Sequence, residues 1–394
     1  MYSELNPYAP GSGLTPPELA GRQAEIDAFD LLVARTRKRN HARGIVLHGL
    51  RGVGKTVLLK RFQHQAEKAD WLIVSLEGNP TAAGQAAIRQ KLARALVAAA
   101  HKFDRTAKVR SRIDDALASV KSFSVSLGVA SIAINAEANA SRANSGQIDV
   151  DLEELVEDLA PALRENSTAL GIFIDEMQDV DSDLLAALLA AQHRAGQDGI
   201  PFFVIGAGLP SLPAILSESR SYAERLFDYR LLGPLSDARA KDAVRIPAER
   251  LGVTFDDAAV DAIVAASGGY PYFLQAFAMN AWDSATGKVI TALDASIGID
   301  QGQVELDMGF YPARWDRATA GERRYLLAMA EDRDTPSSTG ILAQRLESPP
   351  QSLSTVRQGL IDKGIIFAPE RGIVAFTVPG MAAFVIRQAG EGAG

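Results

Sequence analysis

The chain has 394 residues, of which 47% are hydrophobic and 23% are charged, a composition typical of a globular protein with two or three domains. It contains no cysteine, which excludes disulfides, thiolate metal sites and a cysteine nucleophile. The formal net charge is −7, whereas proteins devoted to coating nucleic acid are usually basic, so any DNA contact must be local.

No N-terminal segment has the form of a signal peptide, and no apolar run is long enough to span a bilayer. We therefore expect a cytoplasmic protein without a membrane partner. Residues 1–17 are rich in Pro, Gly and Ser, which predicts a flexible or extended N-terminal arm. A helical pattern of apolar residues follows from Ile26 to Val33 and ends in a basic cluster at residues 35–39. We interpret this cluster as a solvated helix terminus and not as a nucleic-acid surface.

Residues 49–56 fit the phosphate-loop pattern G-x-x-x-x-G-K-[ST]. An apolar run at residues 44–47 predicts a buried strand before the loop, and apolar residues from Val57 onward predict a helix after it. Backbone N–H groups at such a helix N-terminus surround phosphates, so the pattern predicts a site for ATP or ADP. Lys55 would reach the β- and γ-phosphates, and the Thr56 hydroxyl would ligate Mg²⁺. The predicted nucleotide-binding residues of this segment are Gly49, Leu50, Arg51, Gly52, Val53, Gly54, Lys55, Thr56 and Val57.

Residues 121–150 carry an unusual pattern. Apolar residues alternate with serines from Phe123 to Leu127, which predicts a strand, and Ile132 and Ile134 continue the alternation before a polar stretch. We predict a hairpin and a loop inserted in the core. Such an insert can be an edge hairpin without chemistry or a contact for a partner, and the sequence does not choose between them.

A second motif follows a buried strand further along the chain. Residues 170–174 are apolar, and Asp175 and Glu176 come directly after them. In a phosphate-loop protein this placement predicts that Asp175 supports Mg²⁺ and that Glu176 is the catalytic base that polarises the attacking water. The two motifs support each other because each occurs where the other requires it.

Strand patterns at residues 71–76, 202–205 and 227–232 alternate with helical patterns. This order predicts an α/β core, residues 18–235, with a parallel sheet covered on both faces. Residues 236–309 are purely helical in pattern and predict a lid subdomain.

Within the predicted lid, two helix starts are marked by their residues. Pro271 suits a first helical position, and Thr291 with Asp294 predicts a capping box.

The C-terminal part combines helical patterns with a hairpin, an order that predicts a winged helix-turn-helix at residues 310–388. The helical segments are residues 322–330, 341–346 and 352–361, and the hairpin strands are residues 365–367 and 373–376. Residues 389–394 are expected to form a disordered tail.

Together these features resemble the AAA+/STAND class of P-loop ATPases, and within it the bacterial and archaeal ATPases related to origin-recognition initiators. The features are the loop at 49–56, the Asp175-Glu176 pair, Ala20-Gly21-Arg22, Gly268-Gly269-Tyr270-Pro271 and the winged helix. The resemblance covers residues 15–388 and implies a P-loop sheet of the ASCE type with a helical lid. It also implies that Arg22 lies near the adenine and that Pro271 closes over the base or ribose.

The resemblance further implies an arginine that reaches the γ-phosphate of a neighbouring subunit, and hence a homo-oligomer in the ATP state. Arg225, before the fifth predicted strand, and Arg220 are the candidates, and a surface salt bridge is an equal alternative for either. Two departures from the family pattern favour slow, switch-like turnover. The fourth strand ends in Gly206-Ala207-Gly208 instead of a polar residue, with Ser211 the nearest hydroxyl, and the usual sensor arginine is missing after Gly269.

The predicted winged helix offers polar and cationic side chains for duplex DNA. They are Gln351, Ser352, Ser354, Arg357 and Arg371. Residues 316–388 hold nearly equal numbers of basic and acidic groups, which weakens the case for tight DNA binding. Packing or a protein contact therefore remains the alternative for this domain.

Two functional hypotheses follow. The first is a Mg²⁺-dependent ATPase switch whose nucleotide state positions a DNA-binding winged helix. The second is a STAND-like signalling ATPase whose C-terminal domain binds a protein partner. A scaffold that binds nucleotide without hydrolysing it conflicts with the intact Asp175-Glu176 pair.

Overall fold

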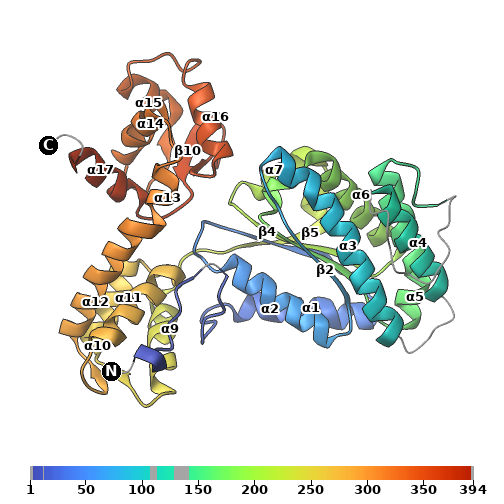
Figure 1. Cartoon of the computed structure of the whole chain (residues 1–394), viewed down its shortest axis with the longest axis horizontal. Helices are drawn as coiled ribbons and strands as arrows, with labels where there is room; N and C mark the ends of the chain where they lie inside the picture. Colours follow the sequence, from blue (N-terminus) through green and yellow to red (C-terminus); the bar gives the residue numbers. More distant parts are fainter. Residues whose placement is uncertain (1–2, 12, 107–112, 128–141, 392–394) are drawn as a thin grey trace.

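The computed structural model describes residues 3–11, 13–106, 113–127 and 142–391. Its N-terminal part is built around a parallel sheet with the strand order β2-β3-β4-β1-β5 (Figure 1). The strands are β1 (Gly44–His48), β2 (Leu72–Glu77), β3 (Leu170–Asp175), β4 (Phe202–Gly208) and β5 (Phe227–Leu231). Every residue of β4 is buried, as expected for a parallel strand that is covered on both faces. The predicted α/β class is confirmed.

Helices cover both faces of this sheet (Figure 1). On one face Ile45 and Leu47 of β1 pack with Phe29 and Phe62, whereas Val46 points to the core on the opposite face. The first face carries α1 (Gln23–Arg37) and α2 (Lys55–Lys68). The opposite face carries α3 (Ala82–Thr106), α4 (Ile113–Ser126), α5 (Ile148–Glu165) and α6 (Ser182–Asp198), and α7 (Leu212–Ser219) and α8 (Ala223–Leu226) precede β5.

The predicted strand from Phe123 to Leu127 is wrong, because most of this segment belongs to helix α4. Ser122 and Ser124 are fully buried, whereas Val125 is 41% exposed, the reverse of what the strand requires. A serine is buried at little cost when its hydroxyl finds a carbonyl acceptor, as the Ser124 hydroxyl does at Ala93 of α3 (3.4 Å). Small side chains therefore let α4 pack between α3 and α5.

The remainder of the predicted insert is only partly described. Ile132 and Ile134, where the strand pattern continues, lie outside the described residues. The last three residues of the predicted insert, from Ile148, already belong to α5.

The segment after β5 is mainly helical and forms a lid. Pro271 occupies the first position of its helix, and Thr291 forms a capping box with Asp294, so both predicted helix starts are confirmed. The lid contains α9 (Asp237–Glu249), α10 (Asp257–Ser267), α11 (Pro271–Ser284) and α12 (Ala292–Glu305), with a short parallel pair, β6 (Thr254–Phe255) and β7 (Val289–Ile290). A π-helical turn (Leu306–Phe310) and α13 (Pro312–Trp315) lead onward.

The C-terminal domain is a winged helix, as predicted. Its elements are α14 (Ala320–Ala330), β8 (Ser337–Ser338), α15 (Thr339–Arg345), α16 (Ser354–Asp362), β9 (Ile366–Phe367), β10 (Ile373–Phe376) and α17 (Met381–Glu391), with the antiparallel order β8-β10-β9. The sequence patterns did not predict α17, whose Phe384 and Val385 are buried. Because α17 extends to Glu391, the expectation of a disordered tail from residue 389 is wrong for its first three residues.

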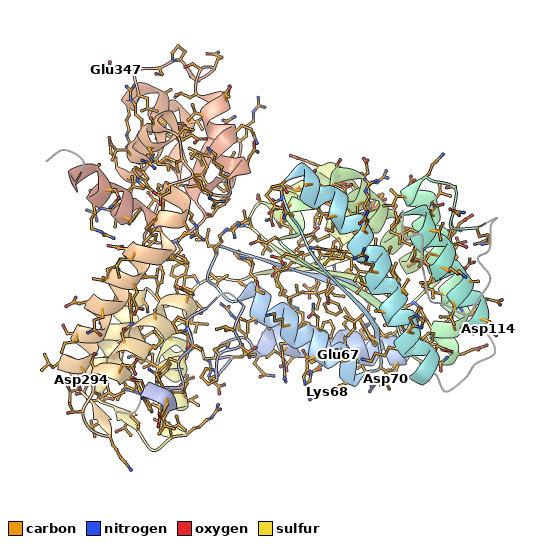
Figure 2. The ribbon with its side chains drawn as sticks, in the orientation of Figure 1. Glu67, Lys68, Asp70, Asp114, Asp294 and Glu347 are labelled. Atoms are coloured by element: carbon orange, nitrogen blue, oxygen red, sulfur yellow. The ribbon has the colours of Figure 1, made fainter. Side chains whose placement is uncertain are left out.

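One continuous hydrophobic cluster runs through the lid and the winged helix, whereas the sheet has clusters of its own. Figure 1 shows the lid and the winged helix stacked beside the sheet domain. Asp294 and Glu347 mark their outer surfaces, away from the sheet (Figure 2). None of the helices in the described ranges combines the length and the apolar character needed to cross a membrane.

The N-terminal arm is attached to the lid, so the prediction of a flexible arm is wrong for its described residues. Tyr8 is 3% exposed and packs edge-on against Phe255 and Trp282 of the lid core. Its hydroxyl donates to the Val244 carbonyl, and the Asn6 amide donates to the Met279 carbonyl (3.0 Å). A single buried aromatic ring thus fixes a segment whose composition is typical of a loop.

Replacement of Tyr8 by Ala should detach the arm and destabilise the lid by about 3 kcal/mol, because a buried aromatic ring is lost and a cavity remains. Thermal unfolding of the full chain would show this as a lower Tm. The matched control is Leu5→Ala in the same arm, since Leu5 is 57% exposed and should change Tm little. Equal Tm values for the two variants would contradict the assignment of Tyr8 as the attachment.

Candidate nucleotide-binding site

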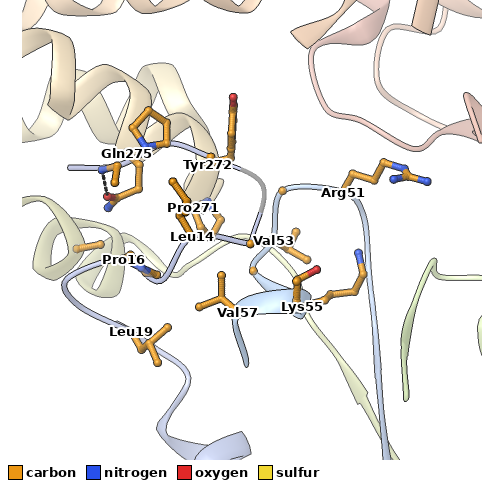
Figure 3. Close-up of a pocket in the computed structure, with 18 of the residues that line it drawn as sticks. Leu14, Pro16, Leu19, Arg51, Val53, Lys55, Val57, Pro271, Tyr272 and Gln275 are labelled. Atoms are coloured by element: carbon orange, nitrogen blue, oxygen red, sulfur yellow. Dashed lines mark hydrogen bonds between the residues drawn. The ribbon is translucent and has the colours of Figure 1, made fainter. Parts of the chain in front are cut away.

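A pocket of about 350 Å³ lies at the carboxyl end of β1, between the phosphate loop, the N-terminal arm and the lid. Leu14, Pro16 and Leu19 lie on one side of it beside Pro271 and Tyr272, and Arg51 and Lys55 lie on the other side (Figure 3). The pocket therefore has one apolar and one cationic side. This division suits a ligand with a flat apolar base and an anionic phosphate chain.

Glycines and one buried lysine shape the phosphate loop. Gly52 and Gly54 have φ values of 85° and 93°, a left-handed conformation that glycine adopts without strain. Lys55 is 7% exposed, and its Nζ donates to the carbonyls of Gly49 and Leu50, both at 2.9 Å. Burial lowers the pKa of Lys55 to about 8, since desolvation disfavours its charged form. A phosphate oxygen at this place would favour the charged form again.

Thr56 and Asp175 are brought together although 119 residues separate them. The Thr56 hydroxyl donates to Asp175 Oδ2 at 2.6 Å, and Asp175 Oδ1 accepts from the Glu176 N–H at 3.0 Å. One hydroxyl and one carboxylate at this place suit Mg²⁺, which keeps several waters and takes further oxygens from phosphates. Among the described residues, no group of three or more His, Asp or Glu side chains could hold a metal by itself.

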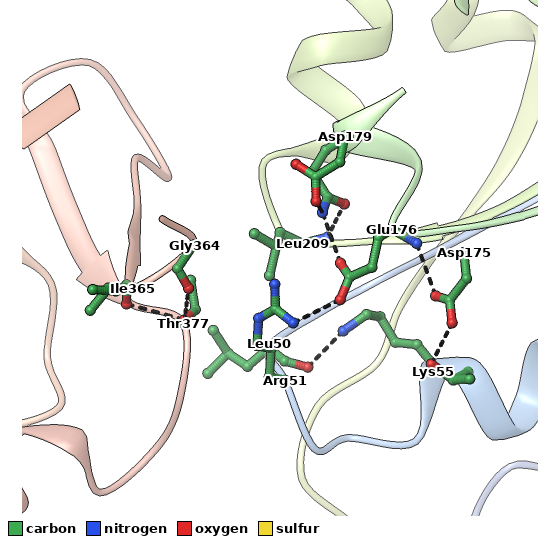
Figure 4. A network of polar contacts seen from close by, with 12 residues as sticks. Leu50, Arg51, Lys55, Asp175, Glu176, Asp179, Leu209, Gly364, Ile365 and Thr377 are labelled. Atoms are coloured by element: carbon green, nitrogen blue, oxygen red, sulfur yellow. Dashed lines mark hydrogen bonds and ion pairs between the residues drawn. The ribbon is translucent and has the colours of Figure 1, made fainter. Parts of the chain in front are cut away.

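Both carboxylate oxygens of Glu176 are engaged (Figure 4). Arg51 Nη1 donates to Oε1 at 2.8 Å, and Gln178 Nε2 donates to Oε2 at 2.8 Å. Gln178 Oε1 in turn accepts from the Leu209 N–H at 3.1 Å, just after β4. Each carboxylate oxygen of Glu176 therefore accepts a hydrogen bond from a protein side chain.

The same network explains why β4 ends in glycines instead of a polar residue. A Cβ at Gly206 would lie 2.3 Å from Met177 Sδ, and a Cβ at Gly208 would lie 2.4 Å from Gln178 Oε1. The side chains after β3 therefore fill the space that a residue at the end of β4 would need. Sequence reasoning missed Gln178, and its only signal was its position two residues after Glu176.

Three parts of the chain hold consecutive residues of the phosphate loop. Arg22 Nη2 donates to the Val53 carbonyl (3.0 Å) and to the Gly233 carbonyl (2.7 Å). The Tyr272 N–H of the lid donates to the Gly52 carbonyl at 3.3 Å, and the Arg51 N–H donates to the Thr377 carbonyl of the winged helix at 3.0 Å.

Of the residues predicted from the family resemblance, Arg22 and Pro271 line this pocket, whereas Arg220 and Arg225 do not. Arg225 lines a separate pocket at the amino ends of the strands, and Arg220 has a buried Nε without a hydrogen-bond partner. A role for either arginine at a neighbouring subunit stays a prediction.

The residues predicted to contact DNA do not lie on one element of the winged helix. Gln351 and Ser352 precede α16, which begins at Ser354, two residues later than predicted. Arg357 is half-buried within α16, and Arg371 is exposed between β9 and β10. The Ser352 and Ser354 hydroxyls donate to the carbonyls of Pro349 and Gln351, a turn that opens the helix.

Comparison with known families agrees with the geometry of this pocket. Residues 18–205 match the AAA ATPase domain. The match implies that the domain binds and hydrolyses ATP. Residues 308–385 match a domain of unknown function, DUF8462, and no curated protein matches the chain.

The solved structures that are similar to this chain have low sequence identity to it. A Walker-type ATPase of Pyrococcus abyssi is 14% identical, with a TM-score of 0.60 over 94% of this chain and 97% of its own. The RuvB Holliday junction branch migration motor of Thermotoga maritima is 17% identical, with a TM-score of 0.46 over 92% and 96%. The Orc1 protein of Aeropyrum pernix, solved in complex with DNA, is 16% identical, with a TM-score of 0.44 over 95% and 94%. The first similarity shows a shared fold over nearly the whole chain.

Sequence reasoning missed one arginine that lines the nucleotide-binding pocket. Arg314 of α13 lines the pocket, although it lies more than one hundred residues beyond the matched domain. It lies over the Phe310 ring at 4.7 Å and donates to the Phe310 carbonyl, and it forms no ion pair with a described carboxylate. Burial and the nearby Arg51 lower the pKa of Arg314 to about 10. No local motif marks it, because its neighbours in the pocket are distant in the sequence.

Replacement of Arg314 by Ala should weaken ATP binding by roughly tenfold or more, since a hydrogen bond to a charged group contributes about 1.5–3 kcal/mol. Titration with a fluorescent ATP analogue would measure the loss. The matched control is Arg317→Ala, because Arg317 is exposed near the same helix and donates only to the carbonyls of Ala313 and Lys363. An unchanged affinity in Arg314→Ala would exclude this side chain from nucleotide binding.

Proposed function

We propose that the protein is an ATPase switch in which the nucleotide at the phosphate loop controls a winged helix that binds duplex DNA. The single observation that supports it most is the pair of contacts made by Arg51. Its guanidinium holds Glu176 (Figure 4), and its backbone N–H holds Thr377 of the winged helix. One loop residue thereby links the candidate catalytic base to the C-terminal domain.

In the proposed reaction, Lys55 and the backbone N–H groups of the loop bind the phosphates, and the apolar arm and Pro271 hold the base. Thr56 and Asp175 would hold Mg²⁺, which when bound offsets the negative charge of the phosphates. Glu176 would accept a proton from the attacking water. To do so it must release at least one of its two donors, because both oxygens are engaged in this conformation.

The winged helix is proposed to control that release. Because the lid and the winged helix share one hydrophobic cluster, we expect the segments 236–309 and 310–388 to move together against the core, residues 18–235. Such a movement would break the Arg51 to Thr377 contact and let Arg51 leave Glu176. The engaged state then hydrolyses ATP slowly, and a ligand that displaces the winged helix accelerates it.

A protein partner is the second candidate for the winged helix. Several of its basic side chains are neutralised by ion pairs, which lowers the positive potential that DNA binding requires. The pairs are Arg345 with Asp332, Lys363 with Glu322 and Arg387 with Asp307. Among the proposed DNA-contacting residues, Arg371 is exposed and forms no ion pair with a described residue. In this alternative the ATP state controls assembly of a homo-oligomer, to which Arg225 or Arg220 would contribute.

The proposed roles at the phosphate loop predict opposite behaviour of two variants. Lys55→Ala should abolish ATP binding, because the buried cation is lost. Glu176→Gln should bind ATP but lower its turnover by roughly 10²-fold or more, since the general base is lost while the shape is kept. Binding titrations and single-turnover hydrolysis would measure both. Turnover that is unchanged in Glu176→Gln would exclude Glu176 as the base.

The proposed switch predicts that duplex DNA raises steady-state ATP turnover at low salt and that the stimulation disappears as salt rises. Arg51→Ala should raise turnover without DNA and reduce the stimulation, because Glu176 is no longer held. The control is Arg61→Ala, an exposed arginine on α2. Turnover that DNA does not change would favour the protein partner, and lower turnover in Arg51→Ala would contradict the inhibitory role of Arg51.

A further inference from the structure

A second pocket, of about 290 Å³, lies at the amino ends of the strands, opposite the nucleotide site at their carboxyl ends. It is formed where the segments before β1, β3, β4 and β5 meet, that is, at the amino ends of the parallel strands (Figure 1). We call it the amino-end pocket. Since the phosphate loop follows the carboxyl end of β1, the two pockets are separated by the length of the sheet.

The ionisable side chains that line the amino-end pocket all belong to basic residue types. They are Arg39, His41, Arg43, Arg164 and Arg225. No Asp or Glu is among the lining residues, although the whole chain has a net charge of −7. The remaining polar lining side chains, including Asn40, Ser167 and Gln197, can donate hydrogen bonds. The pocket is thus lined by basic residues, whereas the net charge of the whole chain is negative.

Among the residues that the structure describes, no carboxylate forms an ion pair with the arginines of this pocket. Arg43 and Arg225 are exposed, and their side chains make no hydrogen bond or ion pair with any described residue. Arg39 Nη2 donates to the Arg164 carbonyl (3.1 Å), and Arg164 Nη2 donates to the Asp198 carbonyl (2.7 Å), so both contact neutral acceptors. The nearby Asp198 carboxylate is paired with Arg194 at 2.7 Å and does not neutralise the pocket.

The local backbone holds these cations together. The Arg35 Nε donates to the His41 carbonyl at 2.8 Å, which folds the turn after α1 back on the helix. Arg39, within this turn, has a φ of 56°, a conformation that is uncommon for a residue with a Cβ. The turn thereby places Arg39 and Arg43 beside Arg164, which comes from the end of α5. The basic cluster that looked like a solvated helix terminus in the sequence therefore continues into a concave surface.

We propose that the amino-end pocket binds a phosphate group, carried either by a nucleic-acid backbone or by a small phosphorylated molecule. Guanidinium groups suit this ligand because their fork of N–H donors matches two phosphate oxygens at once. An anion there offsets the mutual repulsion of four arginines that have no carboxylate partner in the described part of the chain. A nucleic-acid strand that reaches this edge would contact the ATPase core at a place remote from the winged helix.

The test uses the full chain with Lys55→Ala throughout, so that the phosphate loop does not bind the probes. The pocket variant adds Arg39→Gln and Arg43→Gln, which removes two charges but leaves Arg225 in place. The matched control adds Arg61→Gln and Arg94→Gln, two exposed arginines on α2 and α3 that do not line the pocket. Thermal unfolding establishes that both proteins fold. The probes are inorganic pyrophosphate, followed by calorimetry, and a labelled single-stranded oligonucleotide, followed by fluorescence anisotropy.

Pyrophosphate affinity should fall about tenfold or more in the pocket variant and stay unchanged in the control. A nucleic-acid ligand is indicated if oligonucleotide binding also weakens, competes with pyrophosphate and loses roughly one to two units of its salt-dependence slope. If only pyrophosphate depends on the pocket, the ligand is a small phosphorylated molecule; if only the oligonucleotide does, it is nucleic acid. Equal affinities in the two variants for both probes, or no binding of either probe to the Lys55→Ala chain, would overturn the proposal.

Discussion

Main-chain contacts of three consecutive loop residues connect the parts of this molecule. The Val53 carbonyl accepts from Arg22 at the start of α1. The Gly52 carbonyl accepts from Tyr272 of the lid, and the Arg51 N–H donates to Thr377 of the winged helix. A phosphate loop with this many tertiary attachments cannot change shape alone. Any rearrangement that nucleotide causes in residues 51–53 would be passed to at least one of the three attached parts, and this coupling is the physical basis for the proposed switch.

Buried positive charge at the phosphate loop favours the binding of an anion. Among the described residues, the partners of the nearly buried Lys55 are carbonyls, and Arg314 enters the pocket without a carboxylate partner. Desolvation of both cations lowers their pKa values, which means that their charged forms are held at a free-energy cost in the absence of an anion. Glu176 does not offset this cost for Lys55 by direct contact, because its oxygens are taken by Arg51 and Gln178.

Local sequence patterns correctly predicted the elements that they mark. The predictions failed where a contact with a distant segment of the chain decides the structure. The alternation from Phe123 to Leu127 fits a strand, but buried serines place it in helix α4. The composition of the arm fits a flexible segment, but Tyr8 is held by a core more than two hundred residues away. Arg314 and Gln178 carry no motif, and only their neighbours in space give them a place at the site.

The sequence by itself determined the α/β class, the phosphate loop and the acidic pair after β3, because glycine conformation, periodicity and strand burial are local properties. Tertiary structure alone decided that Arg51 holds both Glu176 and the winged helix, and that four arginines gather at the amino ends of the strands. These outcomes depend on which segments the parallel sheet and its crossovers bring to one edge. No single segment contains that information, since each contact joins residues that lie far apart in the chain.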